Sequence, residues 1–578
     1  MPTEKELTGY PSIEKPWVKY YSEDVIKVTM PECSIYEYLW ESNKEHLEEF
    51  ALNYFDRKIT YGELFEEIDK AAKAFSALGV KEGDIVTFAA LSCPETVFSL
   101  YALNKIGAIP NMVNVLSSAE DFKQYINEVD SKVFVCWNVF YNTATEKLSE
   151  TSAKSVVVIE PSNYLPSIKK MLFKLKKSPK INYSSTVLNW NDFIKQGDPI
   201  QLADVCVSAD STCVIAHTGG TTGEPKGVLL SNKAINAVAL QFDKASEHYR
   251  QEVYMDLIVP FVIYGIGVNL HMPLCLGMTV VLIPFFKPEE VPGFFLHYKP
   301  NLVISIPSYW SPLLTSKKTQ KADFSFLRIA GAGGDGLTVE LQHQLDEFLS
   351  SHGSKALIHN GYGMTEVCAS AICAWDYAVR EGSIGIPMPY NNVKIVEPET
   401  DKELGYGEIG EVCIASPSVM LGYYKNEEAT NDLIRMHSDN SKWVHSGDLG
   451  YIDEDGFVFL TGRIRRIILT SYTEIPSKIF PDQIEKVILK HPAVFQCCVV
   501  SDPHPKYKFV TKAHIVLKDG FSNQDEVKTQ IEELCKNNLP DYSIPFSYCF
   551  RNELPLTAVG KVDWRKLEEE ATALRNDK

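Results

Sequence analysis

The segment HTGGTTGEPKGV, from His217 to Val228, decides the fold class of this chain. After His217 it contains four glycines, three threonines and one lysine. Glycines let a backbone approach a polyphosphate closely, threonine hydroxyls and backbone amides donate to phosphate oxygens, and a lysine offsets their charge. The segment is not a Walker A loop, because Lys226 follows Pro225 and precedes a glycine. It predicts a phosphate-binding loop of another type, with a plain glycine-rich surface turn as the alternative.

Several later segments also carry chemically useful side chains. NGYGMTE, which ends at Glu366, places an aromatic ring, a hydroxyl and a carboxylate together, as a purine, a phosphate and a hard cation would require. In HSGDLG, Asp448 is a natural bidentate acceptor for a vicinal diol. AGAGGDG (330–336) is a second glycine-rich run, and LPLTAVGKVDWRKL (554–567) contains Lys561. Taken alone, Glu366 or Lys561 would be an ordinary solvated charge.

These motifs together resemble those of the adenylate-forming superfamily, which includes acyl-CoA synthetases, the adenylation domains of peptide synthetases, and luciferase. ITYGEL (59–64), GVKEGDIV (79–86) and LPDYSIP (539–545) also match, so the resemblance covers roughly residues 35–570. It implies an α/β fold with a large N-terminal domain at 1–463, built of parallel helix-covered sheets plus a small β-barrel-like part. A small mobile α+β domain would follow at 464–578 and carry the catalytic lysine.

The apolar periodicity agrees with that fold class. Helical and strand-like patterns alternate in 60–115, 133–160, 213–285 and 302–375, which predicts parallel sheets covered by helices. Near the start of the chain we expect a helix at 64–78 and a strand at 85–90. From about 391 to 453 the pattern changes to short strands with glycine-rich turns. After Gly462 we expect a smaller unit, with strands at 494–500 and 511–517 and helices at 524–537 and 563–574.

The resemblance implies a role for each matching residue. The loop at 218–226 would grip the β- and γ-phosphates of ATP, Tyr362 would stack on adenine, and Asp448 would accept both ribose hydroxyls. Lys561 would bring the substrate carboxylate to the α-phosphate, and Arg465 would be the hinge for rotation of the C-terminal domain. The implied catalytic residues are Lys561, Thr365 and Glu366, with Glu366 also the ligand of Mg²⁺. The implied nucleotide-binding residues are Thr218, Gly219, Gly220, Thr221, Thr222, Gly223, Lys226, Gly333, Gly334, Asp335, Tyr362, Gly363, Asp448 and Arg463.

The implied reaction is the ATP-dependent ligation of a carboxylic acid to a thiol. A carboxylate is a poor electrophile, so the acid is first joined to AMP with loss of pyrophosphate, and the acyl group then passes to coenzyme A. Positioning and charge neutralisation would carry the first step. An enzyme that loads an acyl or aminoacyl group onto a carrier protein would share every ATP motif and stays the alternative, which the expected lack of a carrier segment after residue 570 weakens. A non-catalytic binding relative would be expected to lack Lys561 or Glu366, and both are present.

The acid is predicted from the segments that supply the pocket wall in this family. They offer Ile263, Ile306, Tyr309 and Trp310, with no evident cation for a second carboxylate. We therefore expect an apolar acid, namely a medium- or long-chain fatty acid. In PFVIYGIG (260–267) Ile263 stands where the family has an aromatic residue, which predicts a more open pocket. The loop at 470–478 lacks the usual glycine pair, which predicts altered contacts to the thiol.

Composition limits the other possibilities. The net charge of −18 argues against a nucleic-acid-binding surface. The thirteen cysteines show no CxxC pair, and the N-terminal residues lack a secretory pattern, so we expect a cytoplasmic protein.

Two segments prompt a membrane hypothesis. Residues 257–286 contain no Asp, Glu, Lys or Arg, but prolines and glycines interrupt them, so buried strands such as 279–283 are the better interpretation. At 165–177, an apolar face opposite lysines would suit peripheral contact with an anionic membrane. A surface helix packed on the domain is the alternative that we favour.

Overall fold

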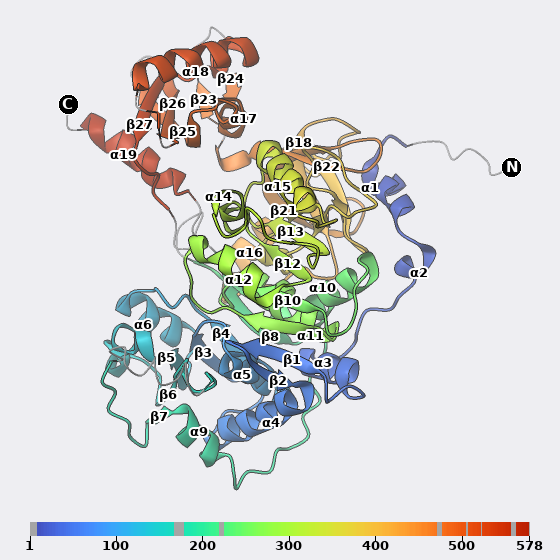
Figure 1. The fold of residues 1–578 in the computed structure, drawn as a ribbon, viewed down its shortest axis with the longest axis vertical. Coiled ribbons are helices and arrows are strands. Elements are labelled where there is room, and N and C mark those ends of the chain that lie inside the picture. Colours follow the sequence, from blue (N-terminus) through green and yellow to red (C-terminus); the bar gives the residue numbers. More distant parts are fainter. Residues whose placement is uncertain are drawn as a thin grey trace, which may run out of the picture.

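Two large sheets of mostly parallel strands form the main body of the protein (Figure 1). The computed structural model describes residues 8–166, 179–218, 225–466, 468–470, 477–504, 507–518, 520–521, 523–556 and 562–576. The eight-stranded sheet has the order β19 (Gly422–Tyr423), β9 (Gly227–Ser231), β8 (Thr212–His217), β4 (Ile109–Met112), β3 (Ile85–Ala89), β5 (Val133–Trp137), β6 (Ser155–Ile159), β7 (Val187–Asn189). The nine-stranded sheet has the order β16 (Ile386–Pro387), β15 (Ile372–Cys373), β14 (Ile358–Tyr362), β13 (Ile329–Gly333), β12 (Leu302–Ser305), β10 (Val253–Asp256), β11 (Thr279–Leu282), β1 (Phe50–Tyr54), β2 (Arg57–Thr60).

Helices cover the sheets and fill the space between them. Along β10 and β12, alternate residues enter different cores, since successive side chains of a strand point to opposite faces. Tyr254 and Leu302 join the core shared with the other sheet, whereas Met255 and Val303 face the opposite way. The shared core takes in α3 (Ile35–Asn43), α4 (Tyr61–Ala77), α5 (Pro94–Lys105) and α10 (Asn232–Ala245), and the other core takes in α12 (Val291–Tyr298) and α15 (Val339–Ser351).

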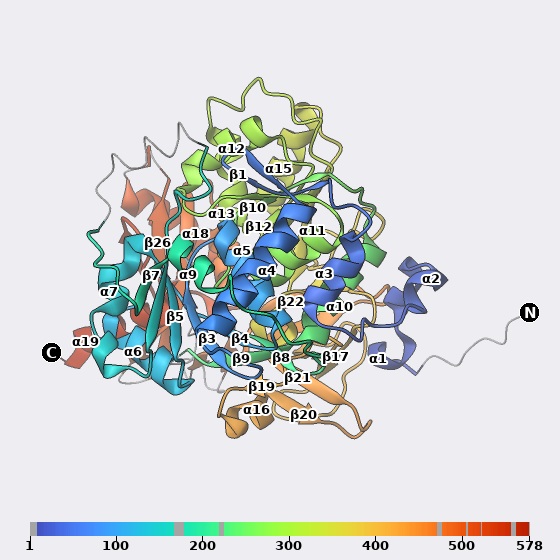
Figure 2. The same ribbon diagram turned by 90° about the horizontal axis from the view of Figure 1, so that it is seen from below.

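A smaller antiparallel sheet and a C-terminal unit complete the fold. The five-stranded sheet contains β17 (Asn392–Val396), β18 (Gly410–Ala415), β21 (Lys442–Ile452), β20 (Ile434–Met436) and β22 (Val458–Arg463). The C-terminal unit contains β23 (Ile468–Thr470), β24 (Ser477–Ile479), β25 (Val494–His504), β26 (Lys508–Leu517), β27 (Ser547–Arg551), α17 (Pro481–Ile488), α18 (Gln524–Asn538) and α19 (Trp564–Asn576). Figures 1 and 2 show this unit in red beside the main body. The predicted α/β class is confirmed.

Local sequence signals explain where the first long helix begins. In ITYGEL, the side chain of Thr60 accepts from the backbone N–H of Glu63, and the side chain of Glu63 accepts from the N–H of Thr60. This capping box satisfies two amide groups that the helix itself cannot pair. The helix therefore starts at Tyr61, three residues before the predicted start.

The long apolar segment near the middle of the chain is only partly a strand. Residues 279–282 form β11 as predicted, but Gly265–His271 is a π-helix that continues into α11 (Met272–Cys275). Among the described residues, no helix combines the length and apolar character needed to cross a membrane. The amphipathic segment at 165–177 lies outside the described residues except for its first two positions, so its contact with a membrane stays a prediction.

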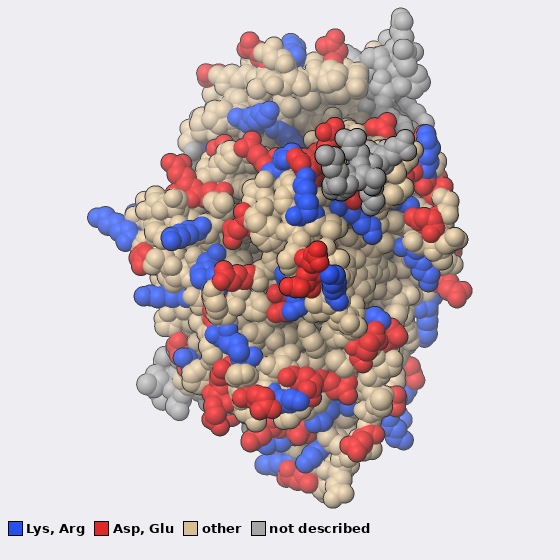
Figure 3. All heavy atoms as spheres, turned by 90° about the vertical axis from the view of Figure 1, so that its right-hand side faces the viewer, with Lys and Arg blue, Asp and Glu red and all other residues tan. Residues whose placement is uncertain are grey.

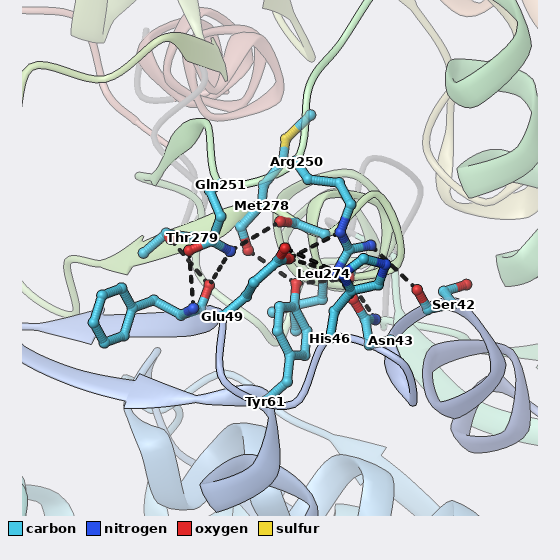
Figure 4. Close-up of polar contacts among 12 residues, drawn as sticks. Ser42, Asn43, His46, Glu49, Tyr61, Arg250, Gln251, Leu274, Met278 and Thr279 are labelled. Atoms are coloured by element: carbon cyan, nitrogen blue, oxygen red, sulfur yellow. Dashed lines mark hydrogen bonds and ion pairs between the residues drawn. The ribbon is translucent and has the colours of Figure 1, made fainter.

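An arginine-centred network ties the N-terminal segment to this apolar region (Figure 4). The guanidinium of Arg250 donates to Glu49 at 2.8 Å, to the carbonyl of Ser42 at 3.2 Å and to the Asn43 side chain at 2.9 Å. Asn43 in turn donates to the carbonyl of Leu274, at 3.1 Å. The network thereby joins the end of α3 to α11.

On the face seen in Figure 3, acidic and basic side chains are interspersed rather than gathered by sign.

We expect Gly277→Ala to destabilise the protein more than Gly79→Ala. Both glycines have positive φ, +74° and +84°, so either alanine bears the strain of a left-handed residue, about 1–2 kcal/mol. Only at Gly277 would the new Cβ lie 2.4 Å from Cζ of Arg250; around Gly79 nothing lies within 4 Å. Urea unfolding would measure both variants. In an Arg250→Ala background the excess cost at Gly277 should disappear, and an excess that persists there would contradict this explanation.

Candidate active site

The two ends of the predicted phosphate loop are held together by β8 and β9. These strands are antiparallel, and His217 pairs with Gly227. The N–H of Thr218 donates to the carbonyl of Lys226 at 3.1 Å, and the N–H of Lys226 donates to Oγ1 of Thr218 at 3.2 Å. The loop between them contains Gly219, Gly220, Thr221, Thr222 and Gly223, which lie outside the described residues. Thr218 and Lys226 therefore close the base of the predicted loop.

A tyrosine that the sequence analysis did not single out links this loop to Glu366. Tyr423 lies on β19, which pairs with β9. Its hydroxyl donates to Oε1 of Glu366 at 2.6 Å, and Nζ of Lys226 lies 4.9 Å from its ring centroid. Burial raises the pKa of Glu366, while the Tyr423 hydrogen bond and the charge of Lys226 oppose that rise. The structure thus gathers a cation, an aromatic ring and a carboxylate beside the loop.

A second cluster forms around Asp448. The hydroxyl of Tyr362 donates to Oδ2 of Asp448 at 2.5 Å, and Nε of Arg463 lies 2.8 Å from Oδ1. Asp448 and Arg463 are directly opposed on β21 and β22, whereas Tyr362 ends β14 of the nine-stranded sheet. Burial and the neighbouring carboxylate raise the pKa of the Tyr362 hydroxyl, so Tyr362 remains a donor. A carboxylate can accept about four hydrogen bonds, so Asp448 can still accept more.

Tight backbone packing surrounds these side chains. A Cβ on Gly363 would lie 1.7 Å from the carbonyl oxygen of Ala369, and one on Gly333 would lie 2.9 Å from that of Gly361. Only glycine fits either position without a shift of the backbone. Thr365 begins a short 3₁₀ turn, Thr365–Val367, and is followed by Cys368 and Ala369, whose φ values are +53° and +80°. Such conformations in non-glycine residues concentrate at functional sites.

A cavity of about 920 Å³ runs along one face of the nine-stranded sheet. The strand register determines which residues form its floor, because residues that are directly paired on neighbouring strands project from the same face of the sheet. Ile304 pairs with Gly331, Gly331 with His359, and Gly333 with Gly361, and all of these line the cavity. Because the glycines have no side chain, they leave the centre of the cavity unfilled. The lining is mostly apolar and includes the predicted residues Ile263, Ile306, Tyr309, Tyr362, Gly333, Gly334, Gly363 and Thr365.

The cavity also contains residues that the sequence analysis missed. Tyr264 lines it and donates to the carbonyl of Ser305 at 3.1 Å, so an aromatic side chain lies in the wall one position after the aliphatic Ile263. At the amino ends of the strands the lining includes Arg328 and His359. Arg328 is paired with Glu252, and Nε2 of His359 lies 3.1 Å from Asp376 without hydrogen-bond geometry. Arg328 precedes β13 and His359 lies on the neighbouring strand β14, and no local motif marks either residue.

Two of the predicted residues, Trp310 and Asp335, belong neither to the two side-chain clusters nor to the cavity wall. Trp310 is buried behind it, where it packs on Phe295 and donates to the carbonyl of Gly331 at 3.0 Å. Asp335 is exposed and accepts from the N–H of Gly336 at 2.8 Å. Lys561 and the side chain of Arg465 lie outside the described part of the chain.

Comparison with protein families gives two matches. The AMP-binding enzyme family matches residues 39–424, and the AMP-binding enzyme C-terminal domain matches residues 483–561. A long-chain-fatty-acid–CoA ligase of Bacillus subtilis is 26% identical over 97% of this chain and 98% of its own length. A probable 4-coumarate–CoA ligase of Dictyostelium discoideum is 28% identical over 87% of this chain and 89% of its own.

Solved structures share the fold over nearly the whole chain. An anthranilate–CoA ligase in complex with anthranoyl-AMP has a TM-score of 0.81 at 23% identity, with 95% of this chain and 99% of that chain covered. ATP-bound MatB from Rhodopseudomonas palustris has a TM-score of 0.81 at 21% identity, with 94% and 100% covered. At this identity the likeness concerns the fold.

We expect Tyr423→Phe to destabilise the protein, and more so at pH 8 than at pH 5. Loss of a hydrogen bond to a buried ionised carboxylate costs about 1.5–3 kcal/mol, and loss of one to the neutral acid costs less. Burial raises the pKa of Glu366 in the folded state, so the protein loses stability as the pH rises through that pKa. The variant lacks the hydrogen bond that opposes this rise, so it should raise the pKa of Glu366 further and lose more stability at high pH. Thermal unfolding at both pH values would measure the difference. Tyr424→Phe, at the adjacent and only partly buried position, is the control. Equal cost at both pH values would contradict an ionised Glu366.

Proposed function

Because this chain belongs to the AMP-binding enzyme family, we propose that it activates a medium- or long-chain fatty acid as acyl-AMP and transfers the acyl group to coenzyme A. The broader class, an AMP-forming acyl-CoA ligase, agrees with the relatives that match nearly the whole chain. Membership of this class leaves the identity of the carboxylic acid to be inferred from the cavity. The relatives and structural neighbours include ligases named for fatty, coumaric, anthranilic and benzoic acids.

One observation carries the choice of acid, namely the length of the apolar cavity. Its lining extends from Gly333, at the carboxyl end of β13, to Arg328, just before the amino end of that strand. Five residues of strand span about 16 Å at ~3.3 Å per residue. An extended chain of single bonds advances about 1.2 Å per bond, since a residue contributes three bonds to ~3.6 Å. The cavity therefore suits an extended chain of roughly 13 bonds.

The residues near Gly333 support a mechanism for the first step. With adenine against Tyr362 and the ribose hydroxyls on Asp448, the triphosphate would extend toward Thr218 and Lys226. Lys226 would offset the charge of the leaving pyrophosphate, and Thr365 would contact the α-phosphate. Lys561 would bring together the acid carboxylate and the α-phosphate, whose charges repel one another. Catalysis by positioning and charge neutralisation requires no general base, because the attacking oxygen is already ionised.

Mg²⁺ is the ion that the family resemblance implies, and Glu366 has the chemistry to hold it. Its carboxylate is a hard ligand, buried beside Tyr423 and within the electrostatic influence of Lys226. When bound there, Mg²⁺ would neutralise phosphate charge. Tyr423 would keep the carboxylate oriented toward the phosphates through its hydrogen bond.

The second step requires the thiol to reach the acyl carbonyl. We propose Arg465 as the hinge about which the C-terminal unit rotates after acyl-AMP forms. Arg465 lies in the 3₁₀ turn Ile464–Arg466, between the last strand of the five-stranded sheet and β23. The next residue, Arg466, is bonded to Glu485 of α17 at 2.5 Å, so it moves with the C-terminal unit.

We expect activity to rise with chain length and then level off. Each buried methylene contributes about 0.8 kcal/mol, or up to roughly fourfold in kcat/KM, until the chain fills the cavity near 14 carbons. A panel of hexanoate, decanoate, tetradecanoate and octadecanoate, with benzoate and malonate as controls, would be assayed for pyrophosphate release and then for acyl-CoA. Preference for benzoate or malonate would contradict the proposed acid. Release of pyrophosphate without acyl-CoA would favour a carrier protein as acceptor.

We expect Lys561→Ala to abolish formation of acyl-AMP while sparing thioester formation from supplied acyl-AMP. The lysine charge is needed only where carboxylate meets phosphate, an effect on the order of 10²–10³ in rate. Lys566→Ala, on the same C-terminal unit, is the matched control. The two half-reactions would be measured separately, and an equal loss in both would contradict a role confined to adenylation.

A further inference from the structure

The turn that presents Asp448 is a bulge in the five-stranded sheet. Glu411 pairs with Leu449 and Cys413 pairs with His445. Between these pairs β18 advances two residues, from 411 to 413, while β21 advances four, from 445 to 449. Ser446, Gly447 and Asp448 therefore lie outside the pairing of β21 with β18, although Asp448 still pairs with Arg463 on β22. Bulges next to active sites re-aim side chains, and here the re-aimed side chain is the carboxylate that meets Tyr362 and Arg463.

A buried carboxylate on the neighbouring strand holds this bulge from behind. Oε1 of Glu411 accepts from the N–H of Gly447 at 3.0 Å, and Oε2 lies 2.8 Å from Nδ1 of His445. Glu411 and His445 are only 6% and 4% exposed, so water does not compete for these bonds. Gly447 has φ of +72°, which lets its N–H turn back toward Glu411. His445, which precedes the Ser446–Asp448 bulge, and Gly447, at its centre, are thus tied to one carboxylate.

A second histidine fixes the ring of His445. Nε2 of His437 lies 2.8 Å from Nε2 of His445, and His437 is buried. Since Glu411 accepts from Nδ1–H of His445, Nε2 of His445 can accept from Nε2–H of His437. Burial, Lys394 and His445 lower the pKa of His437 to about 4, so it remains neutral near pH 7. Hydrogen bonds thus run without a break from His437 to His445 and on to Glu411, which also accepts from Gly447.

The same cluster has the composition of a cation site but does not need one. Ligand atoms of Glu411, Cys413 and His445 lie within 4.8 Å of one another. The hydrogen bonds to Gly447, His445 and His437 already use both oxygens of Glu411 and both nitrogens of His445. Cys413 lies 3.6 Å from Nδ1 of His445 and bonds to no residue of the bulge in the described part of the chain. The hydrogen bonds account for the arrangement.

We propose that Glu411 and His445 are positioning residues, which hold the bulge so that Asp448 presents its carboxylate to the 2′ and 3′ hydroxyls of ATP. The inference rests on the proposed function, because it assumes that Asp448 accepts from the ribose. Neither Glu411 nor His445 touches the nucleotide. They act by keeping Gly447, and with it Asp448, in a conformation that the regular ladder of β18 and β21 would not adopt.

The test compares ATP with 2′,3′-dideoxy-ATP in the pyrophosphate-release assay. Hydrogen bonds from the ribose hydroxyls to a carboxylate should make wild type favour ATP by tenfold to a hundredfold or more in kcat/KM. Glu411→Ala should lower kcat/KM for ATP toward the value for the dideoxy nucleotide and leave the latter nearly unchanged. His445→Ala should act in the same direction. A general loss of folded enzyme would lower both nucleotides in proportion, and that outcome would overturn the proposal.

Three further variants separate the possible failures. Asp448→Ala should abolish the preference for ATP; if it does not, the ribose contact assumed by the proposed function is wrong. If Asp448→Ala abolishes the preference but Glu411→Ala and His445→Ala retain it, the positioning role is wrong. Cys413→Ala changes volume beside His445 without removing a bond to the bulge and should keep the wild-type preference. Glu411→Gln can still accept a hydrogen bond from Gly447, so it should retain part of the preference for ATP. This variant replaces Glu411→Ala in the test if Glu411→Ala fails to fold.

Discussion

The carboxylate of Asp448 links the nine-stranded sheet to the five-stranded sheet. Tyr362 reaches it from the end of the nine-stranded sheet, Arg463 from the last strand of the five-stranded sheet, and Asp448 itself sits on a bulge of β21. A buried carboxylate without partners would be costly, so its position is stable only when both donors are in place. The site therefore forms only where these sheets are docked.

The same junction controls how the C-terminal unit is attached. Arg463 ends β22 and binds Asp448, whereas Arg466, three residues later, binds Asp482 and Glu485 of α17. The chain passes from one set of ion pairs to the other within a single 3₁₀ turn. Arg463 is held by a carboxylate of the five-stranded sheet, and Arg466 is held by carboxylates of the C-terminal unit. A change in the backbone dihedral angles between the two arginines can therefore rotate the C-terminal unit without breaking these ion pairs. This arrangement favours a hinge in this turn.

The cavity depends on a different constraint, the absence of side chains on part of a sheet. Gly331, Gly333 and Gly361 occupy neighbouring positions on β13 and β14, where larger residues would fill the groove. On the opposite face of the same strand, Ala330 and Ala332 pack against the helices of the second core. The strand is therefore built of small residues for two reasons, close packing behind it and open space in front. The resulting groove leads from Gly333 to Arg328 and His359.

The sequence by itself determined the fold class and the residues that short motifs carry. Lys226, Tyr362, Glu366, Asp448 and Arg463 could be singled out because each lies in a short segment that resembles a motif of the adenylate-forming superfamily, and such motifs are local in the sequence. Trp310 and Tyr309 could not be told apart in this way: both lie in one helical turn, yet Tyr309 lines the cavity and Trp310 enters the core behind it.

Tertiary structure decided everything that depends on strand register. Tyr423 meets Glu366 because β19 pairs with β9, and Glu411 meets Gly447 because a bulge shifts β21 against β18. Residues 36 or 57 positions apart carry no mutual signal in one sequence, since their contact is set by which strands pair and in which register. Chemistry that follows from neighbouring residues can be read along the chain, whereas chemistry that follows from neighbouring strands requires the folded sheet.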